Sequence, residues 1–302
     1  MKNQVLIYDN NNIRVSEEPI AIQQKYYLVK PIYVFVDGVE NYIISGYAPL
    51  LKPVVIGHTG VARIIEAGFG SPSESSGSLI VVSPLSFINN SVLGYTANGL
   101  LAKYATIPYD AVFTTLSKHN IEDAILYHAA IGAKVGELVG TNDVLVVGLG
   151  IDGIAALYAL EKARDVAIVT SSKRMYGLAK RLGYNVYKSF KEVKRCFTTV
   201  YISTLSASVI AKAQEYVCYN GKIIVNPLTA HIANSIALDI QKVKHITVTI
   251  AYPDKSLLGK IDRFIDNVVN AIKVIKPRSL EELKTLFPIK PPGAIIDLTE
   301  LK

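Results

Sequence analysis

A glycine-rich segment in the middle of the chain has the residue types and spacing that suit phosphate binding. It reads Gly148-Leu149-Gly150-Ile151-Asp152-Gly153 and lies between the apolar run Val144–Val147 and the helical pattern Ile154–Ala163. A glycine turn between a strand and a helix lets the backbone approach a pyrophosphate, which then meets the N–H groups at the helix start. The segment predicts a dinucleotide site with these residues as its members: Gly148, Gly150, Ile151, Asp152 and Gly153.

The residues after the next apolar run indicate which nicotinamide dinucleotide would fit. The run VAIVT ends in Ser171-Ser172-Lys173-Arg174, without a carboxylate. NAD sites place an Asp or Glu there for the ribose hydroxyls, whereas Ser, Lys and Arg can donate to a 2′-phosphate. Ser171, Ser172, Lys173 and Arg174 therefore predict that NADP is preferred over NAD. Ser203 is assigned to the same cofactor site.

Apolar patterning predicts two kinds of domain around these residues. The first third is rich in Val, Ile and Tyr and is broken by Gly, Pro and Asn, which is typical of short β-strands. From the helical stretch Ile121–Val139 onward, short apolar runs alternate with helical segments. This alternation predicts an α/β fold with a doubly wound parallel sheet. A helix over Ile261–Ile275 and a strand over residues 293–298 are expected at the end.

Composition excludes several function classes. Half of the 302 residues are hydrophobic, and no apolar stretch reaches the roughly 20 residues that span a bilayer. The net charge is +7, but the basic residues are scattered, so we expect no nucleic-acid partner. No signal peptide is evident, which favours the cytoplasm. Cys196 and Cys218 show no metal-ligand spacing and are expected to be reduced and buried.

Three segments resemble a known family. Lys52–Gly60 looks like the pattern P-x-x-x-G-H-E-x-x-G, Leu101–Pro108 looks like A-E-Y-x-x-x-P, and Asp143–Gly183 matches a cofactor-binding half. With a β-rich first third before the glycine turn, the chain resembles the medium-chain dehydrogenases and reductases, the superfamily of the zinc alcohol dehydrogenases. The resemblance implies a GroES-like catalytic domain over residues 1–120 and 256–302, and a Rossmann domain over residues 121–255.

The resemblance also implies a metal site. The family's Cys-Gly-Ser/Thr-Asp motif aligns with Asp37-Gly38-Val39-Glu40, its Gly-His-Glu motif retains His58, and its helical Glu position falls on His128. Asp37, His58 and His128 are the expected ligands, since zinc accepts carboxylate and imidazole groups. Asp37, His58 and Glu40 are the expected catalytic residues. No structural zinc is expected, because the short segment Leu85–Gly99 replaces the lobe that would hold it.

Each candidate ligand also has an ordinary structural explanation. Asp37 could be a turn residue, His58 a strand-end histidine bonded to backbone, and His128 a packed histidine on an apolar helix. Two substitutions argue against catalysis, because Thr59 replaces a Glu of the family and Val39 replaces a hydroxyl of its proton path. Positioned proton transfer contributes about 10²–10⁴ in rate.

Together these features predict an NAD(P)-dependent oxidoreductase of the alcohol dehydrogenase type. Hydride would pass between the nicotinamide and an alcohol, polyol or sugar, or the matching aldehyde or ketone. Two alternatives stay open, a zinc-independent quinone- or enone-type reductase and a dinucleotide-binding protein with reduced catalysis. The resemblance further implies a small-molecule substrate and a homodimer or homotetramer.

Overall fold

The computed structural model describes residues 2–9, 12–48, 50, 53–72, 76–232 and 245–301. The chain forms two compact units. The first unit holds Met1–Tyr127 and Val269–Lys302, and the second holds His128–Val268.

These borders differ from the expected ones because two helical segments stay with their packing partners. The ring of Tyr127 packs edge-on against Phe113 with centroids 5.3 Å apart, so the residues before 128 remain in the first unit. Phe264 stacks on Tyr158 with centroids 6.4 Å apart, and Lys260 forms an ion pair with Glu137. Both contacts hold the residues after 255 in the second unit.

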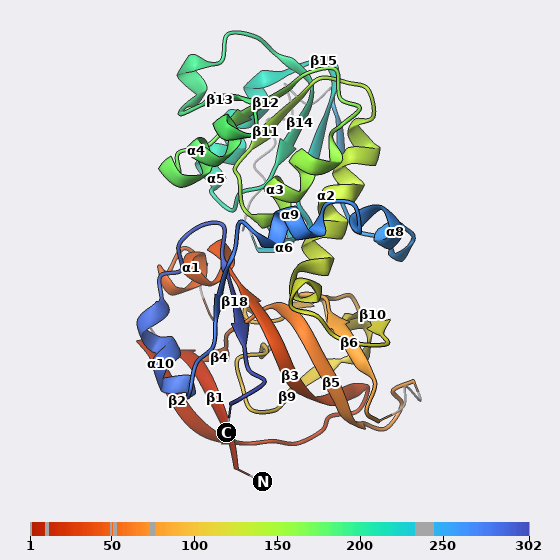
Figure 1. Ribbon diagram of the computed structural model, residues 1–302, viewed down its shortest axis with the longest axis vertical. Helices are drawn as coiled ribbons and strands as arrows, with labels where there is room; N and C mark the ends of the chain where they lie inside the picture. Colours follow the sequence, from red (N-terminus) through yellow and green to blue (C-terminus); the bar gives the residue numbers. More distant parts are fainter. Residues whose placement is uncertain are drawn as a thin grey trace. The chain divides into compact units, whose positions relative to one another are not determined.

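The second unit is built on six parallel strands in the order β13-β12-β11-β14-β15-β16 (Figure 1). The strands are β11 (Val144–Val147), β12 (Val166–Val169), β13 (Asn185–Tyr187), β14 (Phe197–Ile202), β15 (Val217–Val225) and β16 (Thr247–Ile250). The helices are α2 (Leu126–Val139), α3 (Ile151–Ala159), α4 (Lys173–Arg181), α5 (Ala207–Ala213), α6 (Pro227–Ile232), α8 (Leu258–Ile261) and α9 (Ile265–Val269). Single 3₁₀ turns cover Phe190–Glu192, Gln214–Tyr216 and Lys255–Leu257.

The apolar runs explain this sheet. All residues of Val144–Val147 are fully buried, as a central parallel strand covered on both faces requires. The chain starts at β11, runs outward through β12 and β13, and returns to the other side of β11 with β14. This reversal makes the carboxyl ends of β11 and β14 the topological switch point, where such sheets bind dinucleotides. The predicted α/β class with a doubly wound parallel sheet is confirmed.

The first unit is β-rich. Its larger sheet has the order β10-β6-β5-β3-β18-β17 with β9 paired to β3, and two smaller sheets have the orders β2-β1-β4 and β7-β8. The strands of the larger sheet are β3 (Tyr26–Val36), β5 (Thr59–Ala67), β6 (Leu79–Val82), β9 (Ala105–Pro108), β10 (Val112–Leu116), β17 (Lys273–Ile275) and β18 (Ala294–Asp297). The others are β1 (Lys2–Asp9), β2 (Asn12–Pro19), β4 (Val54–Val55), β7 (Leu85–Ser86) and β8 (Ser91–Val92).

The end of the chain returns to this unit through strand pairing. Strand β18 pairs antiparallel with β3, with Ile295 opposite Phe35, and all four residues of β18 are buried. The helices of the unit are α1 (Gly38–Ile44) and α10 (Leu280–Leu283), with 3₁₀ segments at Tyr109–Ala111, Ile121–Ile125 and Lys284–Leu286.

Two sequence-based predictions are wrong. The expected helix over Ile261–Ile275 is interrupted, and Lys273–Ile275 forms strand β17 because it pairs with β18. Cys196 and Cys218 are not reduced, buried thiols. Cys196 directly precedes β14 and Cys218 lies on the adjacent parallel strand β15, so their Cα atoms are 5.0 Å apart. The two residues form a disulfide, and Cys196 is exposed.

Candidate cofactor and metal sites

The glycine turn has one position that only glycine fits and one where an added side chain would be tightly packed. Gly148 has a φ of +88°, and a Cβ there would lie 2.3 Å from the carbonyl oxygen of Ser203. A Cβ on Gly153 would lie 3.0 Å from the carbonyl oxygen of Gly148. Both glycines therefore let helix α3 begin directly beside the carboxyl ends of β11 and β14.

Gly150 is in different surroundings. It is the N-cap of α3 with a φ of −70°, and a Cβ there would meet only Ser203 Oγ at 4.0 Å. The fold itself does not need a glycine at this position. An open backbone at a helix start is what a pyrophosphate group needs for close approach. The structure brings Ser203 to the same place, where its N–H donates to the carbonyl oxygen of Val147 at 2.9 Å.

The four polar residues after β12 lie at the same edge of the sheet. Ser172 is the N-cap of α4, and its Oγ accepts from the backbone N–H of Met175 at 3.4 Å. Ser171, Lys173 and Arg174 are exposed, and the two basic residues begin α4. The carboxyl end of β12 therefore presents hydroxyl and cationic groups without a carboxylate.

Asp152 faces the interior of the second unit. Its Oδ1 lies 2.6 Å from His128 Nδ1, and its Oδ2 accepts from Asn226 Nδ2 at 2.6 Å. The pKa of Tyr201 is raised, first by complete burial and then by the Asp152 charge, so its hydroxyl stays neutral. The predicted cofactor residue Asp152 and the predicted metal ligand His128 are thus partners of one another. Sequence reasoning missed Asn226, although it follows directly on a strand at the binding edge.

Three buried side chains of the first unit form a potential metal-ligand group. Asp37, Glu40 and His58 are 7%, 1% and 0% exposed, and one ligand atom from each lies within 4.8 Å of the others. Glu40 Oε1 lies 2.6 Å from His58 Nδ1. Among the described residues, no other group of three such side chains meets this criterion.

Strand register and a helix cap bring these residues together. Strands β3 and β5 pair antiparallel with Phe35 opposite Thr59, so Asp37 and His58 lie at the same end of the two strands. Asp37 is the N-cap of α1 and accepts from the Val39 N–H at 2.7 Å, and Glu40 Oε2 accepts from the Asp37 N–H at 2.7 Å. This reciprocal capping box could have been detected as Asp-x-x-Glu in the sequence.

The donor set fits a divalent metal ion. Asp37 and His58 offer a carboxylate and an imidazole, which are ligands that zinc accepts, and a set without thiolate is equally open to harder divalent ions. A metal-bound histidine usually donates its second ring N–H to a carboxylate, which is the relation of His58 to Glu40. Thr59 takes no part, because its buried hydroxyl donates to the Val82 carbonyl oxygen at 2.6 Å. The predicted ligand His128 is not a member of this group, and its Nδ1 lies 2.6 Å from Asp152 Oδ1.

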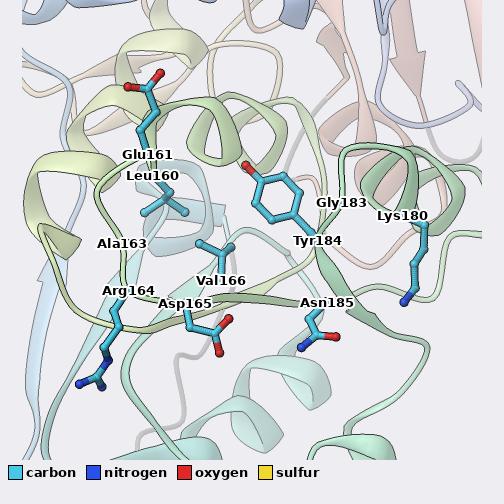
Figure 2. A pocket seen from close by; sticks show the side chains of 10 residues that line it. All are labelled: Leu160, Glu161, Ala163, Arg164, Asp165, Val166, Lys180, Gly183, Tyr184 and Asn185. Carbon is cyan, nitrogen blue, oxygen red and sulfur yellow. The ribbon is translucent and has the colours of Figure 1, made fainter.

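A cavity of about 690 Å³ opens at the other end of the parallel sheet (Figure 2). Its lining residues are Leu160, Glu161, Ala163, Arg164, Asp165, Val166, Lys180, Gly183, Tyr184 and Asn185. Arg164 and Asp165 already have partners in Asp143 and Arg195. The cavity lies at the amino ends of β12 and β13, whereas open α/β sheets bind ligands at the carboxyl ends. It is therefore separate from the glycine turn.

Comparison with known proteins agrees with this architecture. No family model matches the sequence. The chain is 30% identical over 153 residues to the zinc-type alcohol dehydrogenase-like protein C1773.06c of Schizosaccharomyces pombe. This match covers 45% of the chain and 44% of the yeast protein, which is less than half of that protein's length.

Solved structures share the fold over almost the whole chain. Acetophenone reductase from Geotrichum candidum NBRC 4597, in complex with NAD, has a TM-score of 0.74 at 15% identity, covering 99% of this chain and 98% of that one. A provisionally named zinc-binding dehydrogenase from Sinorhizobium meliloti 1021, bound to NADP, has a TM-score of 0.69 at 15% identity, covering 98% and 99%. No helix among the described residues has the length and hydropathy to cross a membrane.

The parallel sheet with its glycine turn, the β-rich unit closed by the end of the chain, and the sequence likeness agree with one another. The solved structures show that the chain shares the fold of these dehydrogenases and reductases, and part of its sequence is similar to the yeast protein.

Proposed function

We propose that this protein is an NAD(P)-dependent oxidoreductase that transfers hydride between the nicotinamide ring and a small alcohol or its carbonyl counterpart. The observation that carries the proposal is the glycine turn at the switch point of the parallel sheet. Gly148 is required by packing and Gly153 is tightly packed, whereas Gly150 leaves the start of α3 open to a pyrophosphate.

This open position gives a direct test. Gly150→Val adds a side chain whose Cβ the fold accommodates, since the only atom within 4.0 Å of that Cβ is Ser203 Oγ. The added atoms would occupy the pyrophosphate position, so we expect NADPH affinity, measured by nicotinamide fluorescence, to fall at least about tenfold. Gly259→Val, also in open space on a helix, is the control and should bind NADPH as the wild type does. Unchanged binding by the Gly150 variant would rule out the proposed cofactor site.

The proposed cofactor is NADP rather than NAD. Lys173 and Arg174 begin α4 at the carboxyl end of β12, where the adenosine ribose of a bound dinucleotide would lie. Each charged hydrogen bond to a 2′-phosphate contributes roughly 1.5–3 kcal/mol. Arg174→Ala and Lys173→Ala should each weaken NADPH binding about tenfold and leave NADH binding unchanged.

Lys180→Ala is the matched control for this preference. Lys180 is a basic residue in the last turn of the same helix and lies over the Tyr176 ring, 6.0 Å from its centroid. Its removal changes the net charge equally but should alter neither affinity. Equal dissociation constants of the wild type for NADPH and NADH would contradict the proposed preference.

The proposed catalytic group is Asp37, Glu40 and His58. Asp37 and His58 would hold a divalent ion, and Glu40 would fix the orientation of the His58 ring. When bound, such an ion polarises a substrate oxygen as a Lewis acid. Burial of all three side chains excludes bulk water from this group, which strengthens its electrostatic interactions.

We further propose that copies of the chain associate. Strand β16 ends the order of the parallel sheet, and Val248 on it is 36% exposed. An apolar strand at a sheet edge offers unpaired backbone groups to another chain. Light scattering should report a mass above one chain, and Val248→Lys should lower it.

A further inference from the structure

A chain of buried hydrogen bonds joins helix α2, helix α3 and the end of β15. His128 lies on α2, Asp152 is the second residue of α3, and Asn226 follows β15. The Asp152 carboxylate is within 2.6 Å of the donor atom of each partner. His128, Asp152 and Asn226 are 0%, 6% and 3% exposed. The Asp152 carboxylate therefore bonds to these two side chains in place of water.

Close helix packing holds this arrangement in place. A Cβ on Gly132 of α2 would lie 2.5 Å from Ala155 Cβ, and one on Gly136 would lie 2.5 Å from the Ala159 carbonyl oxygen. The backbones of α2 and α3 are therefore in direct contact, which brings His128 against the first turn of α3. Burying a carboxylate costs free energy even when it is paired, so stability alone does not account for Asp152.

Asn226 connects the carboxylate to the binding edge of the sheet. Its side-chain Oδ1 accepts from the Leu228 N–H at 2.8 Å, and its own N–H donates to the Ile202 carbonyl oxygen at 3.0 Å. Nearby, Thr229 Oγ1 donates to the Thr204 carbonyl oxygen at 3.0 Å. Asn226 thus connects the start of α6, through its side chain, with the end of β14, through its backbone N–H.

The sheet order shows which half of the cofactor this edge would serve. In a doubly wound sheet the adenosine half lies over the strands on one side of the switch point, and the second mononucleotide lies over those on the other side. Strands β12 and β13 are on the adenosine side, which leaves β14 and β15 for the nicotinamide half.

We propose that Asp152 is a positioning residue for the nicotinamide half of the cofactor, acting through Asn226, with His128 holding the carboxylate in place. The inference rests on the proposed function. It gives Asp152 a role beneath the binding surface rather than beside the phosphates, where its charge would repel them.

A pair of ligands tests this role. NADPH carries the nicotinamide half, whereas 2′-phospho-ADP-ribose keeps the adenosine and pyrophosphate parts without the nicotinamide. Asp152→Asn places an NH₂ donor opposite either His128 or Asn226, which both donate. We expect this variant to bind NADPH about tenfold more weakly, with a diminished nicotinamide fluorescence response, and to bind 2′-phospho-ADP-ribose as the wild type does.

The swap variant Asp152→Asn/Asn226→Asp is the rescue. The amide introduced at position 152 can accept from His128 and donate to the carboxylate introduced at position 226, which still accepts from the Leu228 N–H. NADPH affinity should return to nearly the wild-type value. Asn226→Ala breaks the same link without adding a donor, and it replaces Asp152→Asn if that variant does not fold.

Asp143→Asn is the matched control. Asp143 is 4% exposed and accepts from Arg164 and from Thr198, but it lies at the amino end of β11. Its loss should lower the melting temperature and leave the ratio of the two ligand affinities unchanged.

The outcomes separate this inference from the proposed function. If the Asp152 and Asn226 variants weaken both ligands equally, weaken neither, or are not rescued by the swap, the positioning role is wrong while the function stands. If the wild type binds neither NADPH nor NADH, the proposed function itself fails.

Discussion

At the scale of single residues, Glu40 connects the helix cap to the candidate metal group. Its Oε2 accepts from the Asp37 N–H and closes the capping box of α1, while its Oε1 holds His58 Nδ1. The same side chain therefore fixes both potential metal ligands, one through its backbone and the other through its ring. Neither ligand can shift without disturbing Glu40.

Replacing Glu40 should weaken metal binding, because Asp37 and His58 would lose the carboxylate that holds them in place. Glu40→Gln keeps one carbonyl oxygen but introduces a donor that faces either the Asp37 N–H or His58 Nδ1. Loss of such a supporting carboxylate lowers metal affinity about 10–100-fold, which competition with a chromophoric chelator would measure for zinc.

The control for this substitution is Glu66→Gln. Glu66 lies on β5, the strand that His58 precedes, and its side chain is exposed. The control should bind zinc as the wild type does. Equal zinc affinity for Glu40→Gln and the wild type would show that Glu40 does not support the ligands.

At the scale of elements, the contact between α2 and α3 decides where His128 and Asp152 meet. The contact depends on Gly132 and Gly136, whose missing side chains let the backbones approach Ala155 and Ala159. A larger residue on either helix would separate them. This is a packing constraint, and it is independent of any ligand.

Gly132→Ala should therefore destabilise the second unit. The added methyl group would lie 2.5 Å from Ala155 Cβ, and overpacking of this kind costs about 1–3 kcal/mol. Denaturant titration followed by circular dichroism measures the change in the free energy of unfolding.

Gly177→Ala gives the opposite expectation on another helix. A Cβ there would meet only Arg181 Nη1 at 3.7 Å, so the higher helix propensity of Ala should stabilise by about 0.5–1 kcal/mol. If both substitutions shift the free energy of unfolding in the same direction, the close contact of α2 with α3 does not restrict the residue at position 132.

The disulfide beside β14 and β15 is another contribution to the stability of the second unit. Cys196 and Cys218 are 22 residues apart in sequence, and closing a loop of this size stabilises by about 3 kcal/mol in the chain-entropy account. Cys196→Ser/Cys218→Ser should lower the melting temperature. Reductant should lower it in the wild type but not in the double variant, and identical melting curves would contradict the expectation.

At the scale of the whole molecule, the two halves of the proposed chemistry belong to different units. Asp37, Glu40 and His58 lie in the first unit, and the glycine turn with its neighbours lies in the second. Each unit builds its group from its own strands and helices. The two binding events can therefore be measured separately.

Metal removal should distinguish metal binding from cofactor binding in one experiment. Chelation is expected to abolish turnover of an active alcohol or carbonyl substrate and to leave the NADPH dissociation constant unchanged, because no second-unit residue is needed for the metal group. Adding zinc should restore turnover. Full turnover in metal-free protein would instead support the zinc-independent reductase.

The sequence by itself determined the cofactor half of this protein and much less of the catalytic half. Strand, glycine turn and helix are contiguous over residues 144–159, and their signals depend on local backbone conformation and apolar periodicity. The α/β class and the order of strands and helices in the second unit could be predicted for the same reason. The capping box at Asp37 and Glu40 is equally local.

Only the tertiary structure decided which distant polar groups meet. His128 and Asp152 are 24 residues apart, Asp152 and Asn226 are 74 apart, and the two cysteines join through neighbouring strands. The strand β17 was mistaken for helix because its partner β18 is separated from it in sequence. Such contacts arise from strand register and helix packing across the fold, which no local pattern of residues encodes.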